Sequence, residues 1–105
     1  MKIIVKLVDL ISEELCDAKK YIKLAERYRS EHKELAECFT TLSEAEMGHV
    51  RKLHNEVEKI IEEVRDRDGE PPAEMLAVYN YEHKKQIEKA AKIRRMLDEY
   101  RSIEE

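Results

Sequence analysis

The chain has 105 residues, of which 42% are charged and 42% hydrophobic, with two Gly, two Pro and no Trp. This length fits a single domain over residues 1–105, and a composition rich in Glu, Lys, Leu and Ala favours long amphipathic helices over a sheet or a disordered chain. The formal charge of −4 gives no electrostatic case for nucleic acid, because proteins that bind nucleic acid present a basic face.

Cysteine use and hydropathy predict a cytoplasmic protein with no membrane partner. Cys16 and Cys38 form neither a Cys-x-x-Cys pair nor a disulfide framework, which favours a reducing compartment. The apolar run near the N-terminus is broken by Lys6 and Asp9 and lacks the cleavage site of a signal peptide. No segment has the unbroken apolar length that a membrane span requires.

The first helix is expected over about residues 3–29. Glu14 lies at the centre of its apolar face, because apolar side chains recur within about 40° of it at 100° per residue. These side chains are Ile3, Leu7, Leu10, Ala18, Tyr21, Ala25 and Tyr28. Further apolar residues beyond this face, namely Ile4, Val5, Val8 and Ile11, exceed what one helix contact needs and favour a dimer.

Ser30 is the predicted N-cap of a second helix over about residues 31–65. Its apolar stripe has Glu46 in the middle and His49 near one edge. The stripe consists of Leu35, Phe39, Leu42, Val50, Leu53, Val57 and Ile60. A carboxylate buried in such a stripe needs a hydrogen-bond partner or a cation, because burying it alone is very costly.

Gly69 is predicted to end the second helix in the left-handed conformation, and Pro72 to begin a third helix over about residues 72–101. The inner side of the third helix carries Tyr79, His83, Ala90, Ile93 and Leu97. Three long helices joined by short loops predict an all-α, up-down-up array. The surplus of apolar residues predicts that a second copy completes this array to a helical bundle.

Glu14, Glu46 and His49 are predicted to meet at one height. They lie at similar sequence distances from the loop around Glu31, so an antiparallel hairpin places all of them about 25 Å from the turn. Two carboxylates at one level, with no Lys or Arg on either stripe nearby, repel each other, and a bound cation removes that repulsion. Carboxylate oxygens with an imidazole nitrogen suit iron or manganese, and zinc less selectively.

The same three residues carry a family resemblance. Glu14 followed by Glu46-Met47-Gly48-His49 resembles the first two helices of the ferritin-like superfamily, which includes rubrerythrins, and is most similar to the short encapsulated-ferritin type. The resemblance covers roughly residues 7–64. It implies that the three residues are iron ligands, that Glu46 bridges two metals, and that dimerisation completes a di-iron site.

The chain also departs from the family pattern. It has no second Glu-x-x-His motif for a complete site within one copy, and no Cys-x-x-Cys pairs for a rubredoxin-like centre. The resemblance implies an encapsulating protein or a redox protein as a candidate partner. No residue of the sequence identifies either one.

The leading hypothesis is a small ferritin-like protein that binds iron at a dimer interface, with oxidation of Fe(II) by oxygen or peroxide as its candidate reaction. The alternative is a non-enzymatic helical-bundle interaction module or phage-type accessory protein, in which Glu46 and His49 form a structural network. A chain so rich in glutamate contains about one Glu-x-x-His by chance, so the motif has little weight without its position on the stripe.

A weaker candidate cluster consists of His54, Glu82 and His83. Counting back across the second loop places Glu82 and His83 level with His54, about 10 Å along the axis from the predicted metal site. An interfacial Glu and His are more often a satisfied structural contact than metal ligands. A separate metal site at these three residues stays as the alternative.

Overall fold

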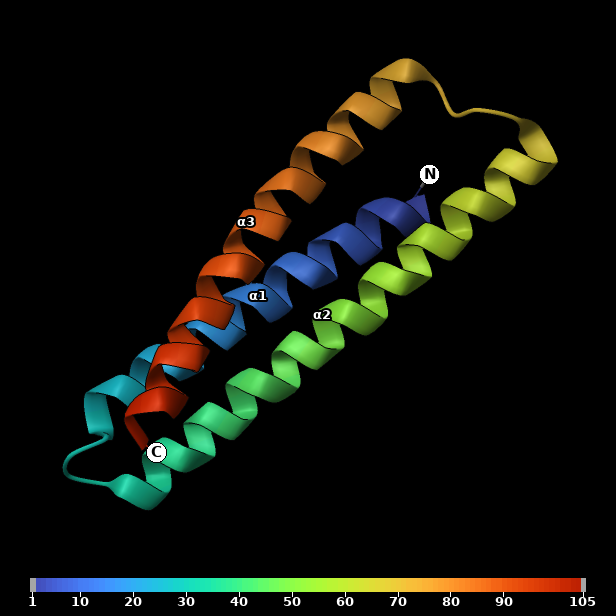
Figure 1. Cartoon of the computed structure of the whole chain (residues 1–105). Helices are drawn as coiled ribbons and strands as arrows, with labels where there is room; N and C mark the ends of the chain where they lie inside the picture. Colours follow the sequence, from blue (N-terminus) through green and yellow to red (C-terminus); the bar gives the residue numbers. More distant parts are fainter. Residues whose placement is uncertain (1, 105) are drawn as a thin grey trace.

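The computed structural model describes residues 2–104, which form α1 (Lys2–Tyr28), α2 (Lys33–Asp68) and α3 (Ala73–Glu104). The chain reverses direction at both loops, so that α1 and α3 run one way and α2 the other (Figure 1). No strand occurs in this described part of the chain. The prediction of an all-α chain with three helices is confirmed, and each observed helix end lies within three residues of its expected position.

The first loop differs from the prediction at the start of α2. Ser30 is not the N-cap, because α2 begins after His32, which makes no side-chain cap hydrogen bond. The N–H of His32 donates to the carbonyl of Tyr28 at 2.8 Å, so the chain makes one further turn after α1 before it reverses. The polar side chain of Ser30 identified the loop correctly, whereas this extra turn moves the helix start two residues further on.

Glycine and proline separate α2 from α3. Gly69 has a φ of 83°, and its N–H donates to the carbonyl of Arg65 at 2.9 Å. The positive φ agrees with the prediction, because glycine has no Cβ to oppose it. However, its ψ is −169° rather than about +47°, so Gly69 does not adopt the left-handed helical conformation that was predicted. Pro72 lies one residue before α3 rather than inside it, and its carbonyl accepts the N–H of Met75 at 3.0 Å. The rigid proline therefore precedes the first turn of α3.

Small side chains bring α1 and α2 close together. Ala18 and Ala25 of α1 and Ala36 and Ser43 of α2 have no exposed surface. The hydroxyl of Ser43 donates to the carbonyl of Ala18 at 2.7 Å, which ties the two helices together. The large side chains of the core extend this contact along both helices, and the principal ones are Ile11, Leu15, Ile22, Met47 and Val57.

The apolar stripe predicted for the second helix packs on the core only in part, since Val57 is fully buried and Phe39, Val50 and Leu53 are partly buried against it. The buried residues of α2 are Ala36, Thr40, Ser43, Met47 and Val57, whereas Leu35 and Leu42 of the stripe are 44% and 38% exposed. In α1, Ile11 belongs to the core and not to a surplus face. The reason is steric, since small residues allow the closest approach of two helices. The part of the stripe that carries Leu35 and Leu42 is left directed outward.

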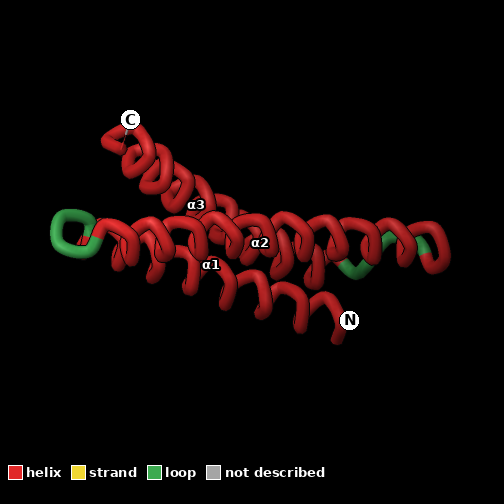
Figure 2. The backbone as a smooth tube through the Cα atoms, turned by 90° about the horizontal axis from the view of Figure 1, so that it is seen from below, coloured by secondary structure: helices red, strands yellow, loops and turns green. Residues whose placement is uncertain are grey.

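The third helix packs mainly on α1 and touches α2 little. Gln86, which is 7% exposed, donates to the carbonyl of Val8 at 2.9 Å and to the hydroxyl of Ser12 at 3.0 Å. Ile93 and Leu97 are buried, as expected for the inner side of this helix. Figure 2 shows α3 inclined to the other two helices, so only part of its length lies against them.

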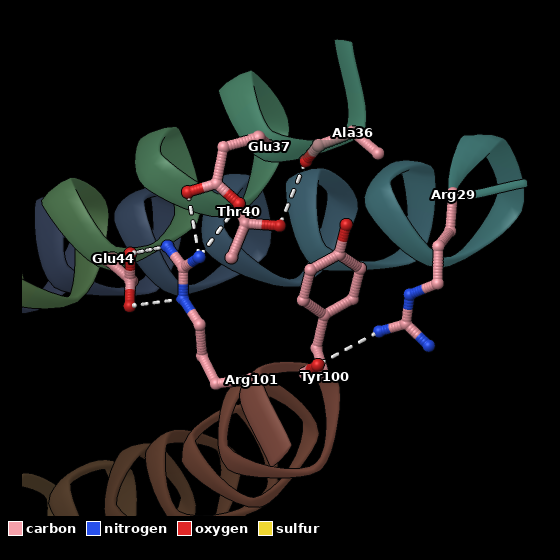
Figure 3. A network of polar contacts seen from close by, with 7 residues as sticks. All are labelled: Arg29, Ala36, Glu37, Thr40, Glu44, Tyr100 and Arg101. Carbon is pink, nitrogen blue, oxygen red and sulfur yellow. Dashed lines mark hydrogen bonds and ion pairs between the residues drawn. The ribbon is translucent and has the colours of Figure 1, made fainter. Parts of the chain in front are cut away.

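An arginine joins the C-terminal part of α3 to α2 (Figure 3). The guanidinium of Arg101 donates to both oxygens of Glu37 at 2.7 and 2.8 Å and to Glu44 at 2.7 Å. Hydrogen bonds from Glu44 and then Glu37 raise the pKa of Arg101 above its usual value. Next to it, the carbonyl of Tyr100 accepts a hydrogen bond from Arg29 at 3.2 Å, and the Arg29 guanidinium carbon lies 3.7 Å from the Tyr100 ring centroid.

The three helices give an elongated molecule of 56 × 21 × 17 Å. This shape follows from helices that lie along one another, with the two loops at opposite ends (Figure 1). Over residues 2–104, none of the helices is both long enough and apolar enough to cross a bilayer.

Candidate metal centre

Glu14 of α1 and Glu46 and His49 of α2 come together at one level of the hairpin. One ligand atom from each lies within 4.8 Å of the other two. His49 Nδ1 is 3.4 Å from Glu14 Oε2 and 3.8 Å from Glu46 Oε2. In the part of the chain that the structure describes, no other three His, Cys, Asp or Glu residues converge in this way. These three residues are called the Glu–Glu–His trio below.

The trio lies on the face of the hairpin that α3 does not cover. Ser12 marks the covered side of α1, because its hydroxyl accepts a hydrogen bond from Gln86 of α3. Glu14 lies two residues further on and points about 160° away around the helix. By helical periodicity, Leu10 and Tyr21 of α1 and Phe39, Leu42 and Leu53 of α2 lie on the same side of their helices as the trio, and all but Leu42 are partly buried.

The electrostatics of the trio are unbalanced. Glu46 Oε2 is buried and accepts no hydrogen bond from the described residues, since its 3.8 Å separation from His49 is too long for one. Glu46 and Glu14 keep only 18% and 28% of their side chains exposed. No Lys or Arg within residues 2–104 forms an ion pair with either carboxylate. Among the described side chains, His49 carries the only nitrogen within ion-pair distance of these two carboxylates.

This donor set fits a divalent transition metal. Two carboxylate oxygens and one imidazole nitrogen are ligands that Fe(II), Mn(II) and Zn(II) accept. The imidazole of His49 is 52% exposed, so the site opens to the surface instead of being closed within one copy. Three protein ligands leave coordination positions free on the metal ion, because such an ion prefers more than three ligands. A second chain, water or a substrate could occupy those positions.

The residues of the weaker cluster do not all meet. The rings of His54 and His83 stack with centroids 4.4 Å apart and planes 6° apart. Instead, Oε1 of Glu82 lies 3.5 Å from Nζ of Lys85 in the same helix. Stacked parallel rings direct their nitrogen lone pairs along parallel planes, so those of His54 and His83 do not converge on one ion. The geometry is that of an aromatic contact between α2 and α3.

Two further residues complete this contact, namely Tyr79, which the sequence placed on the inner side of the third helix, and Glu58, which it did not single out. The ring of Tyr79 also stacks with that of His83, with centroids 5.6 Å apart, and Glu58 Oε1 lies 2.9 Å from His54 Nε2. Both are one helical turn from their histidine, a spacing that could have identified them. Burial, and then His54, lowers the pKa of His83, while Glu58 acts in the opposite direction. Burial, followed by Glu58, raises the pKa of Tyr79.

No protein-family model, curated protein or solved structure matches the chain. The fold and the site define an all-helical chain that carries a Glu–Glu–His trio on an uncovered apolar face.

Proposed function

We propose that this chain is a small ferritin-like protein that binds iron, with Glu14, Glu46 and His49 as its ligands. The observation that carries the proposal is the buried Oε2 of Glu46, which lacks a hydrogen-bond partner beside a second carboxylate and an imidazole. A cation would satisfy this oxygen and cancel the repulsion between the carboxylates. Fe(II) and Mn(II) suit the donor set, and Zn(II) suits it less selectively.

A second copy completes the site in this proposal. Leu35 and Leu42 are partly exposed on the same face as the trio, which is a surface that a partner could cover. Glu14 lies near the middle of α1, so a two-fold axis beside it would let two hairpins overlap along most of their length. The axis would bring the two trios face to face. The combined ligands would resemble a carboxylate-rich di-iron site.

The candidate reaction has iron as its substrate. Each Fe(II) ion would lose one electron to become Fe(III), and dioxygen or peroxide would accept the electrons. Glu46 would be shared between two ions, while Glu14 and His49 would each bind one. Carboxylates favour the higher charge of Fe(III), and the partial exposure of the trio would give small oxidants access.

The second candidate function is a non-enzymatic helical interaction module. One observation favours it, because the 3.4 Å contact between His49 and Glu14 closes the trio without a metal when Nδ1 carries the proton. In such a module the trio would only strengthen the contact between α1 and α2. The protein would then be indifferent to Fe(II).

An anaerobic Fe(II) titration followed by admission of oxygen separates the two functions. We expect saturable binding to the wild type and a rise in Fe(III) absorbance once oxygen enters. Glu46→Gln removes the unpaired charge and should abolish both signals. Glu44→Gln is the matched control, since Glu44 binds Arg101 and faces away from the trio. Equal binding by both variants, or none by the wild type, would overturn the iron proposal.

A further inference from the structure

An apolar groove of about 980 Å³ opens at the end of the molecule remote from the α1–α2 loop. It lies between the first turns of α1, the last turns of α2 and the first turns of α3, where α2 and α3 diverge before the loop that joins them (Figure 1). Its apolar lining consists of Ile4, Val5, Val8, Ile61, Val64, Met75, Leu76, Val78 and Tyr79, with Pro71 and Pro72 from the loop. The groove shares no residue with the Glu–Glu–His trio.

Three large hydrophobic side chains in this groove are unusually exposed. Val78 is 66% exposed, Val5 60% and Met75 42%. Single exposed apolar residues are common, but a cluster in one concave surface indicates a binding site. Met75 adds adaptability, because its unbranched side chain fits partners of differing shape.

The rim of the groove is acidic. Its charged residues are Asp9, Asp68, Glu70, Glu74 and Glu82 against the single cation Arg67. Arg67 is already engaged, with its Nε 3.0 Å from Asp68 Oδ2. Asp9 and Glu74 form no ion pair with any residue of the described chain. Two carboxylates, one from α1 and one from α3, thus remain available to a positively charged partner.

We propose that this groove binds a short cationic amphipathic helix of another protein. The partner's apolar side chains at positions i, i+3 or i+4, and i+7 would pack against Val8, Met75 and Val78. Lysine or arginine residues beside that stripe would pair with Asp9 and Glu74. The first turns of α3 that line the groove extend for about 12 Å, which matches about two turns of the bound helix.

Charge argues against a second copy of this chain as the occupant. Two grooves placed face to face would bring two acidic rims together, which is unfavourable. The basic residues of α3 do not form the required helix either, because Ile87 is the single large hydrophobic exposed among Lys84, Lys85, Lys89 and Lys92. We therefore assign the cationic helix to another protein.

Selection from a displayed library of helical twelve-residue peptides tests the proposal with the full-length chain. We expect the selected peptides to carry a positive net charge and apolar residues at i, i+3 or i+4, and i+7. A labelled peptide from this pool should bind less tightly as salt concentration rises. Selection of acidic or uncharged peptides, or no enrichment at all, would overturn the proposal.

Two exposed hydrophobics of α3 provide a matched pair of variants. Val78→Glu places a charge in the groove, whereas Ile87→Glu places the same charge on α3 outside it. We expect at least a tenfold loss of peptide binding in Val78→Glu and none in Ile87→Glu. An added carboxylate would attract a cationic peptide if charge alone mattered, so this loss would show apolar contact. Equal binding by the two variants, or self-association of the wild type that only Val78→Glu abolishes, would contradict the proposal.

Discussion

Glu44 and Glu46 lie two residues apart in α2 and point to opposite sides of the α1–α2 hairpin. Glu44 accepts a 2.7 Å hydrogen bond from Arg101 of α3, while Glu46 belongs to the trio on the uncovered face. Side chains two residues apart in a helix point about 200° apart. Because Glu44 faces α3, Glu46 therefore faces away from it. The hairpin therefore separates a face held by α3 from an uncovered face, where the proposed metal and second copy would bind.

Glu46→Gln should stabilise the metal-free protein. Glu14 and Glu46 repel each other across a gap that no Lys or Arg of the described chain compensates. Neutralising one of them should raise the free energy of unfolding by about 1 kcal/mol, since both side chains are partly screened by water. Urea unfolding in the presence of a chelator measures this change. Glu44→Gln, which breaks an ion pair, should shift stability the opposite way.

Fe(II) should raise the melting temperature of the wild type and leave Glu46→Gln unchanged. A ligand at about a hundred times its Kd stabilises the folded state by about 2.7 kcal/mol. In a chain of this size each kcal/mol corresponds to about 4–8 °C. Anaerobic differential scanning calorimetry with and without Fe(II) measures the shift. The same shift in both proteins would show that the metal binds elsewhere.

Leu42→Glu should separate the two copies. Leu42 is 38% exposed on the face of the trio, so the substitution should barely change the stability of one copy. A charge at an apolar dimer interface should weaken association at least tenfold, or about 1.4 kcal/mol. Mass measurement by light scattering with Fe(II) present checks this, with Ile87→Glu on the covering helix as the control. A wild type that stays monomeric with Fe(II) bound would refute the dimer.

His83 should make stability fall in acid. Burial lowers the pKa of His83 below 6.5, so the unfolded chain binds a proton more readily than the folded one. The penalty is absent above the unfolded value of 6.5, grows as the pH falls below it, and levels off below the lowered pKa. His83→Phe retains a ring for the stack and should lose less stability than the wild type between pH 7.5 and 5.

Urea unfolding gives the free energy of unfolding of the wild type and of His83→Phe at pH 7.5 and 5. The difference between their changes with pH isolates the contribution of His83. His32→Gln is the control, because His32 lies exposed in the first loop and its removal should retain the wild-type pH dependence. If His83→Phe and the wild type lose the same stability in acid, the His54–His83 stack is not the source.

Arg101→Ala should loosen the C-terminal turns of α3. The side chain is 35% exposed and bridges Glu37 and Glu44, so its removal should cost about 1 kcal/mol. Amide hydrogen exchange should speed up in the last turns of α3 before it does in α1 or α2. Arg95→Ala, an exposed arginine of the same helix, should leave exchange unchanged. Arg101→Lys should rescue little, because one ammonium does not span both carboxylates.

The sequence by itself determined the positions of the helices and the level of each residue along them. Gly69 and the prolines mark the second loop, and the constant rise per residue brings Glu14 level with Glu46 and His54 level with His83. These properties are local, because they depend on backbone preferences and on counting along one helix.

Only the tertiary structure decided which side of α1 and of α2 is inside, whereas the inner side of α3 was predicted from the sequence. Two faces of α2 qualified, one with large apolar residues and one with Ala36, Thr40 and Ser43, and periodicity ranks them by apolarity alone. The close approach of Ser43 to Ala18 selects the face with small residues. The pairing of Arg101 with Glu44 and the stacking of His83 on His54 join residues far apart in the chain, so no local pattern of the sequence specifies them.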